Sequence, residues 1–309
     1  MYAPQPMHIP DGFLSLPVLI LLWLITLGVV GYALKRLSRD LGERQVPLMG
    51  VLAAAIFAAQ MLNFSVTGGT SGHLMGAALA TILLGPWPAV VVMTTVVAIQ
   101  ALIFQDGGLL ALGANLFNMA VLAVGVAYFT YTSLRRLLPG GKSMAIAGFV
   151  SAWVSIVIAA LATGLELALS GTSPANLAIP AMGAIHALIG IGEGLITVGA
   201  LGFLRLVRPD VLQVESGAPI EKKVWLGGLG LAVLLSVLSP LASSHPDGLE
   251  WVAEQYGFLQ NALPPLYTLI PDYLVPGVRD ERLATILAGI LGVIIVFAIT
   301  WSVSRARKG

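Results

Sequence analysis

Two histidines give this chain its clearest chemistry. His8 lies near the start of the chain, in the sequence MHIPDG at residues 7–12, and His73 ends the glycine-rich stretch TGGTSGH at residues 67–73. An amine followed by a histidine offers one ion an amine nitrogen, an amide nitrogen and an imidazole through fused chelate rings, and a second imidazole completes a plane of nitrogens. Such planar sets suit Ni(II) and Cu(II), and Co(II) can be accommodated. Two imidazoles beside a chain terminus therefore predict a transition-metal site, and solvated or hydrogen-bonded loop histidines are the alternative.

Three asparagines, Asn63, Asn115 and Asn118, lie in or beside apolar segments. A side-chain amide among membrane helices commonly hydrogen-bonds from one helix to another. It can also hold a metal-binding imidazole in one orientation. We name Asn63 and Asn118 as candidates for that second role.

His186 and Glu193 are seven residues apart in one apolar segment, so on a helix they share a face, two turns apart. We expect Glu193 near mid-membrane, where a carboxylate is costly and marks a candidate functional site. Either Glu193 is neutral or paired and holds helices together, or His186 and Glu193 form an intramembrane polar site. Glu166 is expected nearer a membrane edge, where water solvates it.

Several classes of protein are disfavoured by what the chain lacks. It has no cysteine, which excludes disulfides, thiolate ligands and thiol catalysis. It has no His-Glu-x-x-His, Gly-x-Ser-x-Gly or Walker lysine motif, so an ATP-driven step needs another subunit. The net charge of +1 comes with no basic block suited to nucleic acid.

The composition predicts a membrane protein made of helices. The chain is 57% hydrophobic and 10% charged, with a mean hydropathy of +0.92. Its long apolar runs approach or exceed the roughly 17–20 residues that cross a bilayer as a helix. Because backbone polar groups must be paired internally in hydrocarbon, continuous apolar runs form helices there. We predict an all-α integral membrane protein with nine segments, at 14–35, 47–63, 73–85, 88–104, 109–134, 144–169, 181–206, 224–243 and 283–303.

The basic residues predict the orientation. With nine segments, 14 of the 16 lysines and arginines fall on one side of the membrane, and only Arg279 and Arg282 fall on the other. The side with the excess is cytoplasmic by the positive-inside rule, so the N-terminus is expected outside and the C-terminus inside. The 14 residues are Lys35, Arg36, Arg39, Arg44, Arg135, Arg136, Lys142, Arg205, Arg208, Lys222, Lys223, Arg305, Arg307 and Lys308.

The predicted segments divide into two groups. A polar linker at 209–223 separates a membrane domain at 1–208 from a two-helix hairpin at 224–309, which carries an outer loop. The segment 73–85 is marginal in length for a full span, because the sequence GPWP at 85–88 interrupts it. A broken or re-entrant helix is therefore an alternative there.

At this point the motifs resemble a known family. The sequences MHIPDGFL at 7–14, GGTSGHLMG at 68–76, FQDGG at 104–108 and NLFNM at 115–119 resemble the CbiM/NikM family, over about residues 7–208. These proteins are the substrate-capture (S) components of energy-coupling factor (ECF) transporters for cobalt and nickel. The motif PDGLE at 246–250 makes the tail similar to the accessory component CbiN/NikN. The chain thus looks like a natural fusion of the NikMN/CbiMN type.

The resemblance implies a fold and a set of site residues. It implies a bundle of about seven helices in the cell (inner) membrane, followed by the hairpin. The ion would be held by the terminal amine, by the amide and imidazole of the next residue and by a loop histidine, which map to Met7, His8 and His73. A membrane T component and two ATPase subunits would be partners. A coupling surface is expected at four small residues, Ala54, Ala55, Ala58 and Ala59, with ordinary helix packing as the alternative there.

The sequence therefore predicts a non-enzymatic subunit that captures Ni²⁺ or Co²⁺ for ATP-driven import, with the ion as cargo and a slight preference for nickel. The alternatives are a proton-coupled secondary carrier that uses Glu193, and an intramembrane enzyme that uses Glu193 and His186. Six residues precede Met7, although the family motif begins at its initiator methionine. We therefore expect the functional chain to start at Met7, which would supply the amine.

Overall fold

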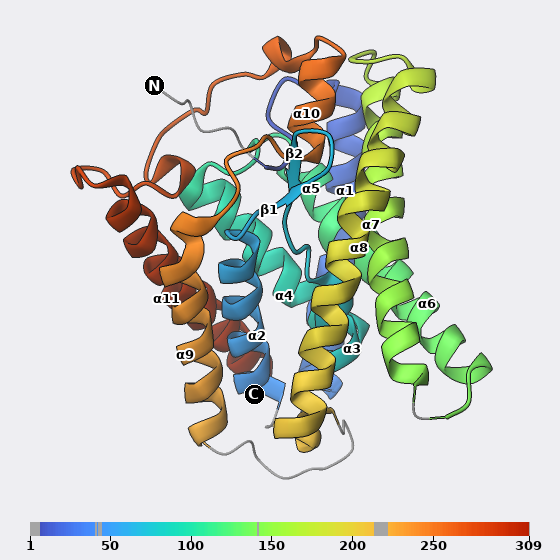
Figure 1. The fold of residues 1–309 in the computed structure, drawn as a ribbon, viewed down its shortest axis with the longest axis vertical. Coiled ribbons are helices and arrows are strands. Elements are labelled where there is room, and N and C mark those ends of the chain that lie inside the picture. Colours follow the sequence, from blue (N-terminus) through green and yellow to red (C-terminus); the bar gives the residue numbers. More distant parts are fainter. Residues whose placement is uncertain (1–6, 41, 43–44, 141, 213–221, 309) are drawn as a thin grey trace.

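The computed structural model describes residues 7–40, 42, 45–140, 142–212 and 222–308, which form a bundle of helices (Figure 1). In this described part, strands occur only in one antiparallel hairpin, made by β1 (Phe64–Val66) and β2 (Thr70–Gly72). The hairpin contains the glycine-rich stretch and delivers the chain to His73. The prediction of an all-helical membrane protein is confirmed apart from this short hairpin.

Each predicted segment contains a helix in the described residues. Seven helices are long and apolar enough to cross a membrane, with a shorter apolar helix, α2 (Gln45–Gln60), beside them. The long ones include α1 (Leu16–Asp40), α4 (Pro86–Ile99) continued by the π-helical turn η1 (Gln100–Phe104), α5 (Leu112–Leu116) continued by the π-helical η2 (Phe117–Leu122) and α6 (Ala123–Leu137), α7 (Ser143–Leu169), α8 (Ala175–Val207), α9 (Lys222–Leu238) and α11 (Glu281–Lys308).

The segment predicted at 73–85 is the broken one. Only Ala77–Leu84 is helical, as α3, and residues 73–76 precede it without regular structure. Gly76 and Gly85 flank this helix with φ angles of +82°, which residues with a Cβ rarely adopt. Pro86 then starts α4, since its fixed φ suits the first turn of a helix.

The two ends of the bundle differ. The N-terminal segment, the β hairpin and the short helix α10 (Gly248–Gln255) lie at one end, which we call the site end, and the C-terminus lies at the other (Figure 1). The end of α8 and the start of α9 also lie at the end opposite to α10. Of the 14 basic residues predicted to share one side, those that the structure describes lie at or beside the ends of α1, α6, α7, α8, α9 and α11 that are found at this opposite end.

The tail helices α9 and α11 pack against α2. The ring of Phe57 on α2 lies 5.3 Å from that of Phe104 and 6.0 Å from that of Tyr273, a residue of the loop between α9 and α11. Phe57 also lies against Gly292 of α11, where even a Cβ would be 2.1 Å from its ring. The tail therefore shares a hydrophobic core with α2.

This packing decides where the four predicted coupling alanines lie. Ala54 and Ala58 are 0% exposed, so these two pack inside the molecule and present no surface to a partner. Ala55 and Ala59 are half-buried. A coupling surface at Ala55 and Ala59 stays a prediction.

Candidate metal site

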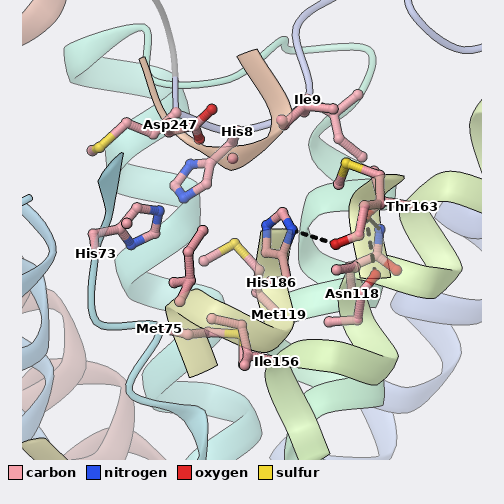
Figure 2. Close-up of a pocket in the computed structure, with 18 of the residues that line it drawn as sticks. His8, Ile9, His73, Met75, Asn118, Met119, Ile156, Thr163, His186 and Asp247 are labelled. Carbon is pink, nitrogen blue, oxygen red and sulfur yellow. Dashed lines mark hydrogen bonds between the residues drawn. The ribbon is translucent and has the colours of Figure 1, made fainter. Parts of the chain in front are cut away.

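A cavity of about 90 Å³ at the site end is lined by residues from six parts of the chain, among them α5, η2 and α7 (Figure 2). The N-terminal segment contributes His8, and the segment after the β hairpin contributes His73. Helix α8 contributes His186, and the start of α10 contributes Asp247. The remaining lining is largely apolar and includes the thioethers of Met7, Met75, Met119 and Met182.

The structure brings His8 and His73 together, as the sequence predicted. Their ring centroids lie 5.8 Å apart, with the planes at 79°. A metal–nitrogen distance of about 2.1 Å places a ring centroid about 3.2 Å from the ion, so two imidazoles on one ion have centroids about 4.5 to 6.4 Å apart. The observed separation lies within this range.

Asp106 and Asn115 hold the segment that carries His8. The backbone N–H of Met7 donates to Oδ1 of Asp106 at 2.8 Å, and Nδ1 of His8 donates to the Asp106 carbonyl at 3.1 Å. The Asn115 amide accepts from the N–H of Ile9 and donates to its carbonyl, both at 3.0 Å. Asn115 thus pairs with Ile9 as a neighbouring strand would, which fixes the residue after His8.

The turn after Asp106 leaves room for His8. Gly107 has a φ of +106°, and a Cβ there would lie 3.0 Å from the Cβ of His8. Glycine is favoured at Gly107 both by its φ and by the close approach of His8. The FQDGG motif therefore builds the wall behind His8, a role that its sequence alone did not indicate.

The orientation of the His8 ring differs from the predicted chelate. A carbonyl oxygen only accepts, so Nδ1 carries a proton, and Nε2 is the ring nitrogen that this hydrogen bond leaves available for another partner. His8 is 4% exposed, and its Nε2 is buried without a hydrogen-bond partner. A six-membered chelate with its own amide uses Nδ1, so the ring must turn to form it. Residues 1–6, on which the predicted terminal amine at Met7 depends, lie outside the described residues.

His73 is held as a neutral imidazole. Its Nδ1 donates to the carbonyl of Leu74 at 3.1 Å. Burial, followed by the neighbouring His8, lowers the pKa of His73 from its ordinary value of 6.5 to about 4. The neutral form has the ring lone pair that a metal ion needs.

His186 and Glu193 share a face of α8, but their side chains contact different parts of the molecule. His186 lines the cavity. Glu193 is 0% exposed and accepts two backbone hydrogen bonds, from Met75 N–H at 2.6 Å and from Gly76 N–H at 3.0 Å. Glu193 therefore anchors the segment that follows His73, and the predicted joint polar site is not observed.

The surroundings of Asn118, Asn63 and Glu166 differ from those predicted. Asn118 lines the cavity, but it donates to Thr163 and to Oε2 of Glu166 rather than to an imidazole. Glu166 was expected in water and is 5% exposed, so that prediction was wrong. Asn63 lines a neighbouring cavity instead.

That neighbouring cavity, of about 240 Å³, gathers carboxylates from both parts of the chain. It shares Met7 and Asp247 with the first cavity. Burial raises the pKa of Asp247 well above its ordinary value, although the Glu250 N–H donates to its carboxylate at 2.7 Å. Burial also raises the pKa of Glu250 to about 7 and that of Asp272 to about 6. The acidic lining residues are Asp106, Asp247, Glu250 and Asp272.

The tail loop reaches the loop that carries His73. The N–H and the hydroxyl of Ser71 donate to the carbonyls of Pro246 and His245, both at 2.8 Å. The indole of Trp251 donates to the carbonyl of Gly68 at 3.2 Å. The PDGLE motif therefore closes one side of the cavity. No sequence spacing could indicate this, because the paired residues are more than 170 positions apart.

Comparisons with known proteins agree with this arrangement. A family model described as the cobalt uptake substrate-specific transmembrane region, CbiM, matches residues 8–211. The chain belongs to the CbiM family. A PDGLE domain matches residues 222–309 of this CbiM protein.

Relatives and a solved structure extend the match. A protein of Archaeoglobus fulgidus, named as a candidate fused nickel transport protein NikMN, is 40% identical over 98% of this chain and 99% of its own. The fused nickel transport protein NikMN of Rhodobacter capsulatus is 30% identical over 94% of this chain and 95% of its own. A crystal structure of a truncated transition metal transporter is similar with a TM-score of 0.59 and 36% identity, over 64% of this chain and 98% of the other.

These matches confirm the predicted family, the predicted membrane location and the predicted role in nickel or cobalt transport. The CbiM protein is a multi-pass membrane component of a nickel or cobalt transporter, and a PDGLE domain forms its tail.

Proposed function

We propose that this chain is the ion-capturing S component of an ATP-driven ECF importer, and that it takes up Ni²⁺ or Co²⁺ at His8 and His73. One observation carries the proposal. Two imidazoles from distant parts of the chain face one cavity at a separation that a shared ion can bridge, and Nε2 of His8 has no hydrogen-bond partner there. The imidazole of a histidine is a suitable ligand for both ions.

The site end faces the outside of the cell in this proposal. Its support is the gathering of the basic residues at the opposite end, since cytoplasmic loops carry the excess of lysine and arginine. An ion then enters from outside and meets the histidines before it crosses. Ni²⁺ is our first choice of cargo, because both fused relatives are named as nickel transport proteins.

The energy comes from partner subunits in this proposal. The sequence has no Walker lysine motif, so a membrane T component and two ATPase subunits would supply the ATP-driven step. The rival secondary carrier needs Glu193 to exchange a proton, but both oxygens of Glu193 accept backbone N–H groups. That arrangement favours a fixed anchor over a proton relay. The rival intramembrane enzyme needs His186 beside Glu193, and the two serve different places.

Metal binding tests the capture site. Calorimetry with Ni²⁺ and with Co²⁺ should give tight binding to the purified chain and none measurable to His73→Ala. The matched control is His245→Ala, since His245 lines the neighbouring cavity and not this one. Uptake in cells that lack the ATPase subunits tests the energy source and should be absent. Binding of Ni²⁺ by His73→Ala with wild-type affinity would refute the proposed site. Uptake in cells without the ATPase subunits would refute the ECF mechanism.

A further inference from the structure

The tail reaches the N-terminal segment through one carboxylate. Asp106 is 3% exposed, and its Oδ1 accepts from the N–H of Met7 at 2.8 Å. Its Oδ2 accepts from the hydroxyl of Tyr273 at 2.7 Å, and its backbone carbonyl accepts from Nδ1 of His8 at 3.1 Å. A single residue of the FQDGG motif therefore contacts both proposed ligand residues of the N-terminal segment and one residue of the tail.

The loop between α10 and α11 packs along the chain just before Asp106. The hydroxyl of Tyr267 donates to the carbonyl of Leu102 at 2.7 Å. Tyr273 is 8% exposed, and its ring stacks on that of Phe104 with the centroids 4.7 Å apart and the planes at 15°. These contacts fix the ring of Tyr273, so its hydroxyl meets the Asp106 carboxylate from a defined position.

The backbone is strained on both sides of this hydrogen bond. Among the residues that the structure describes, a positive φ outside glycine occurs at Gln105, Asp272 and Tyr273 alone, with angles of 56°, 56° and 59°. Gln105 directly precedes Asp106, and the other two residues end the turn η6 (Pro271–Tyr273). Such angles are unfavourable for residues with a Cβ, and they persist where the surroundings enforce them, often at functional sites. The hydrogen bond from Tyr273 to Asp106 therefore joins two strained turns, which points to a role beyond packing.

We propose that Tyr273 is a positioning residue of the capture site, because its hydroxyl fixes the Asp106 carboxylate that holds Met7. This inference rests on the proposed capture function. It agrees with an amine ligand at Met7, since an amine bound to the ion keeps N–H groups that can donate to Asp106. Burial, followed by the charge of Asp106, raises the pKa of Tyr273 well above its ordinary value of 10, so the hydroxyl keeps its proton and stays a donor. Without this donor, the carboxylate is free to rotate away from Met7.

Calorimetry with Ni²⁺ on the full chain tests this role. Tyr273→Phe keeps the ring on Phe104 and removes the hydroxyl alone. Its affinity should fall about tenfold, the lower end of the effect of removing an outer partner of a metal ligand. Tyr267→Phe is the matched control with wild-type affinity expected, because it removes a hydrogen bond of the same length from the same loop and leaves Asp106 untouched. A melting curve of each variant measures stability separately.

A double variant shows whether Tyr273 acts through Asp106. The amide in Asp106→Asn has a single oxygen, with an NH₂ group in place of the other, so it cannot accept from Met7 and Tyr273 at separate oxygens. It breaks the link between them and keeps the shape of the side chain. Adding Tyr273→Phe to Asp106→Asn should therefore cost little further affinity. A purely structural role of Tyr273 predicts instead that the two losses of affinity add.

The outcomes separate this inference from the capture function. A loss of affinity that is confined to Tyr273→Phe and disappears in the Asp106→Asn background supports the positioning role. Wild-type affinity in Tyr273→Phe, an equal loss in Tyr267→Phe, or additive losses in the double variant would each overturn it. Wild-type affinity in His73→Ala would instead refute the capture site itself.

Discussion

Met7 shows how one atom sets the chemistry at the residue scale. Its backbone N–H donates to Oδ1 of Asp106, a carboxylate that also accepts from the hydroxyl of Tyr273 at 2.7 Å. When residues precede Met7, this nitrogen is an amide and must lose its proton before it can bind a metal ion. When Met7 begins the chain, the nitrogen is an amine with a lone pair that can bind the ion. The ion, this amine and the next amide nitrogen then form a five-membered chelate ring.

We therefore predict that a chain beginning at Met7 binds Ni²⁺ at least tenfold more tightly than the chain with residues 1–6, which is about 1.4 kcal/mol of binding free energy. Calorimetry on the two purified chains measures the difference. Acetylation of the amine in the shorter chain is the control and should abolish the advantage. Equal affinity of the two chains would show that the amine has no part in the site.

Glu193 is the second residue whose substitution is informative. Its two oxygens accept the N–H groups of Met75 and Gly76, just after His73. In Glu193→Gln the amide can accept at one oxygen only, and its NH₂ group faces the other N–H. A hydrogen bond to a charged group contributes about 1.5–3 kcal/mol, so the free energy of unfolding should fall by about that amount.

If Glu193 positions His73, metal affinity should fall in Glu193→Gln together with stability. Calorimetry with Ni²⁺ and a denaturation curve measure the two effects. Thr300→Val is a suitable control, because Thr300 is buried in α11, away from the cavity. A variant that loses stability but keeps full affinity would leave Glu193 as a structural anchor only.

At the scale of elements, α10 is the piece that connects the tail to the cavity. In Gly248→Ala the added methyl group would meet the ring of His186, and this overpacking should cost about 1–3 kcal/mol of stability or displace the ring. We expect weaker Ni²⁺ binding by calorimetry. Gly227→Ala is the control, because Gly227 of α9 has open space where its Cβ would be, and neither quantity should fall.

The elements also show what the sequence could and could not predict. Long apolar runs predicted the helices well, because hydrocarbon leaves the backbone no other partner than itself. The break before α3 was visible in the marginal length of 73–85 and in the sequence GPWP. Our expectation for Glu166 was wrong, because its position near a helix end says nothing about Asn118, which comes from another helix and donates to its carboxylate.

The proximity of His8 and His73 was predictable for a different reason. His8 and His73 are brought together by segments at one end of the bundle, and the topology indicated that end. The contact of the tail with the β hairpin depends on pairs such as Ser71 and Pro246, which no periodicity connects. The role of Asp106 could not be predicted either, because three segments that are distant in the sequence meet at its carboxylate.

At the scale of the whole molecule, the open matter is whether the tail is a separate module. Its helices share a core with α2 through Phe57 and Gly292, and its loop lines the cavity. These contacts argue that the tail contributes to stability. The solved structure of a truncated transition metal transporter has counterparts for 64% of this chain, so a shorter relative folds without counterparts of the rest. The linker at 209–223 is the place where the two arguments can be compared.

We predict that a chain cut in this linker yields a folded fragment 1–208 that still binds Ni²⁺, because His8, His73 and their backbone anchors all lie within it. Its affinity should be lower than that of the whole chain, since the tail no longer holds Ser71 or packs on His186. Calorimetry and size-exclusion chromatography in detergent measure both properties. Separate expression of 224–309 should restore uptake in cells, because the hydrogen bonds and the α2 contact need no covalent link. An aggregated fragment 1–208 would show that the two parts form one folding unit, and undiminished uptake by the fragment alone would show that the tail has no role in loading the ion.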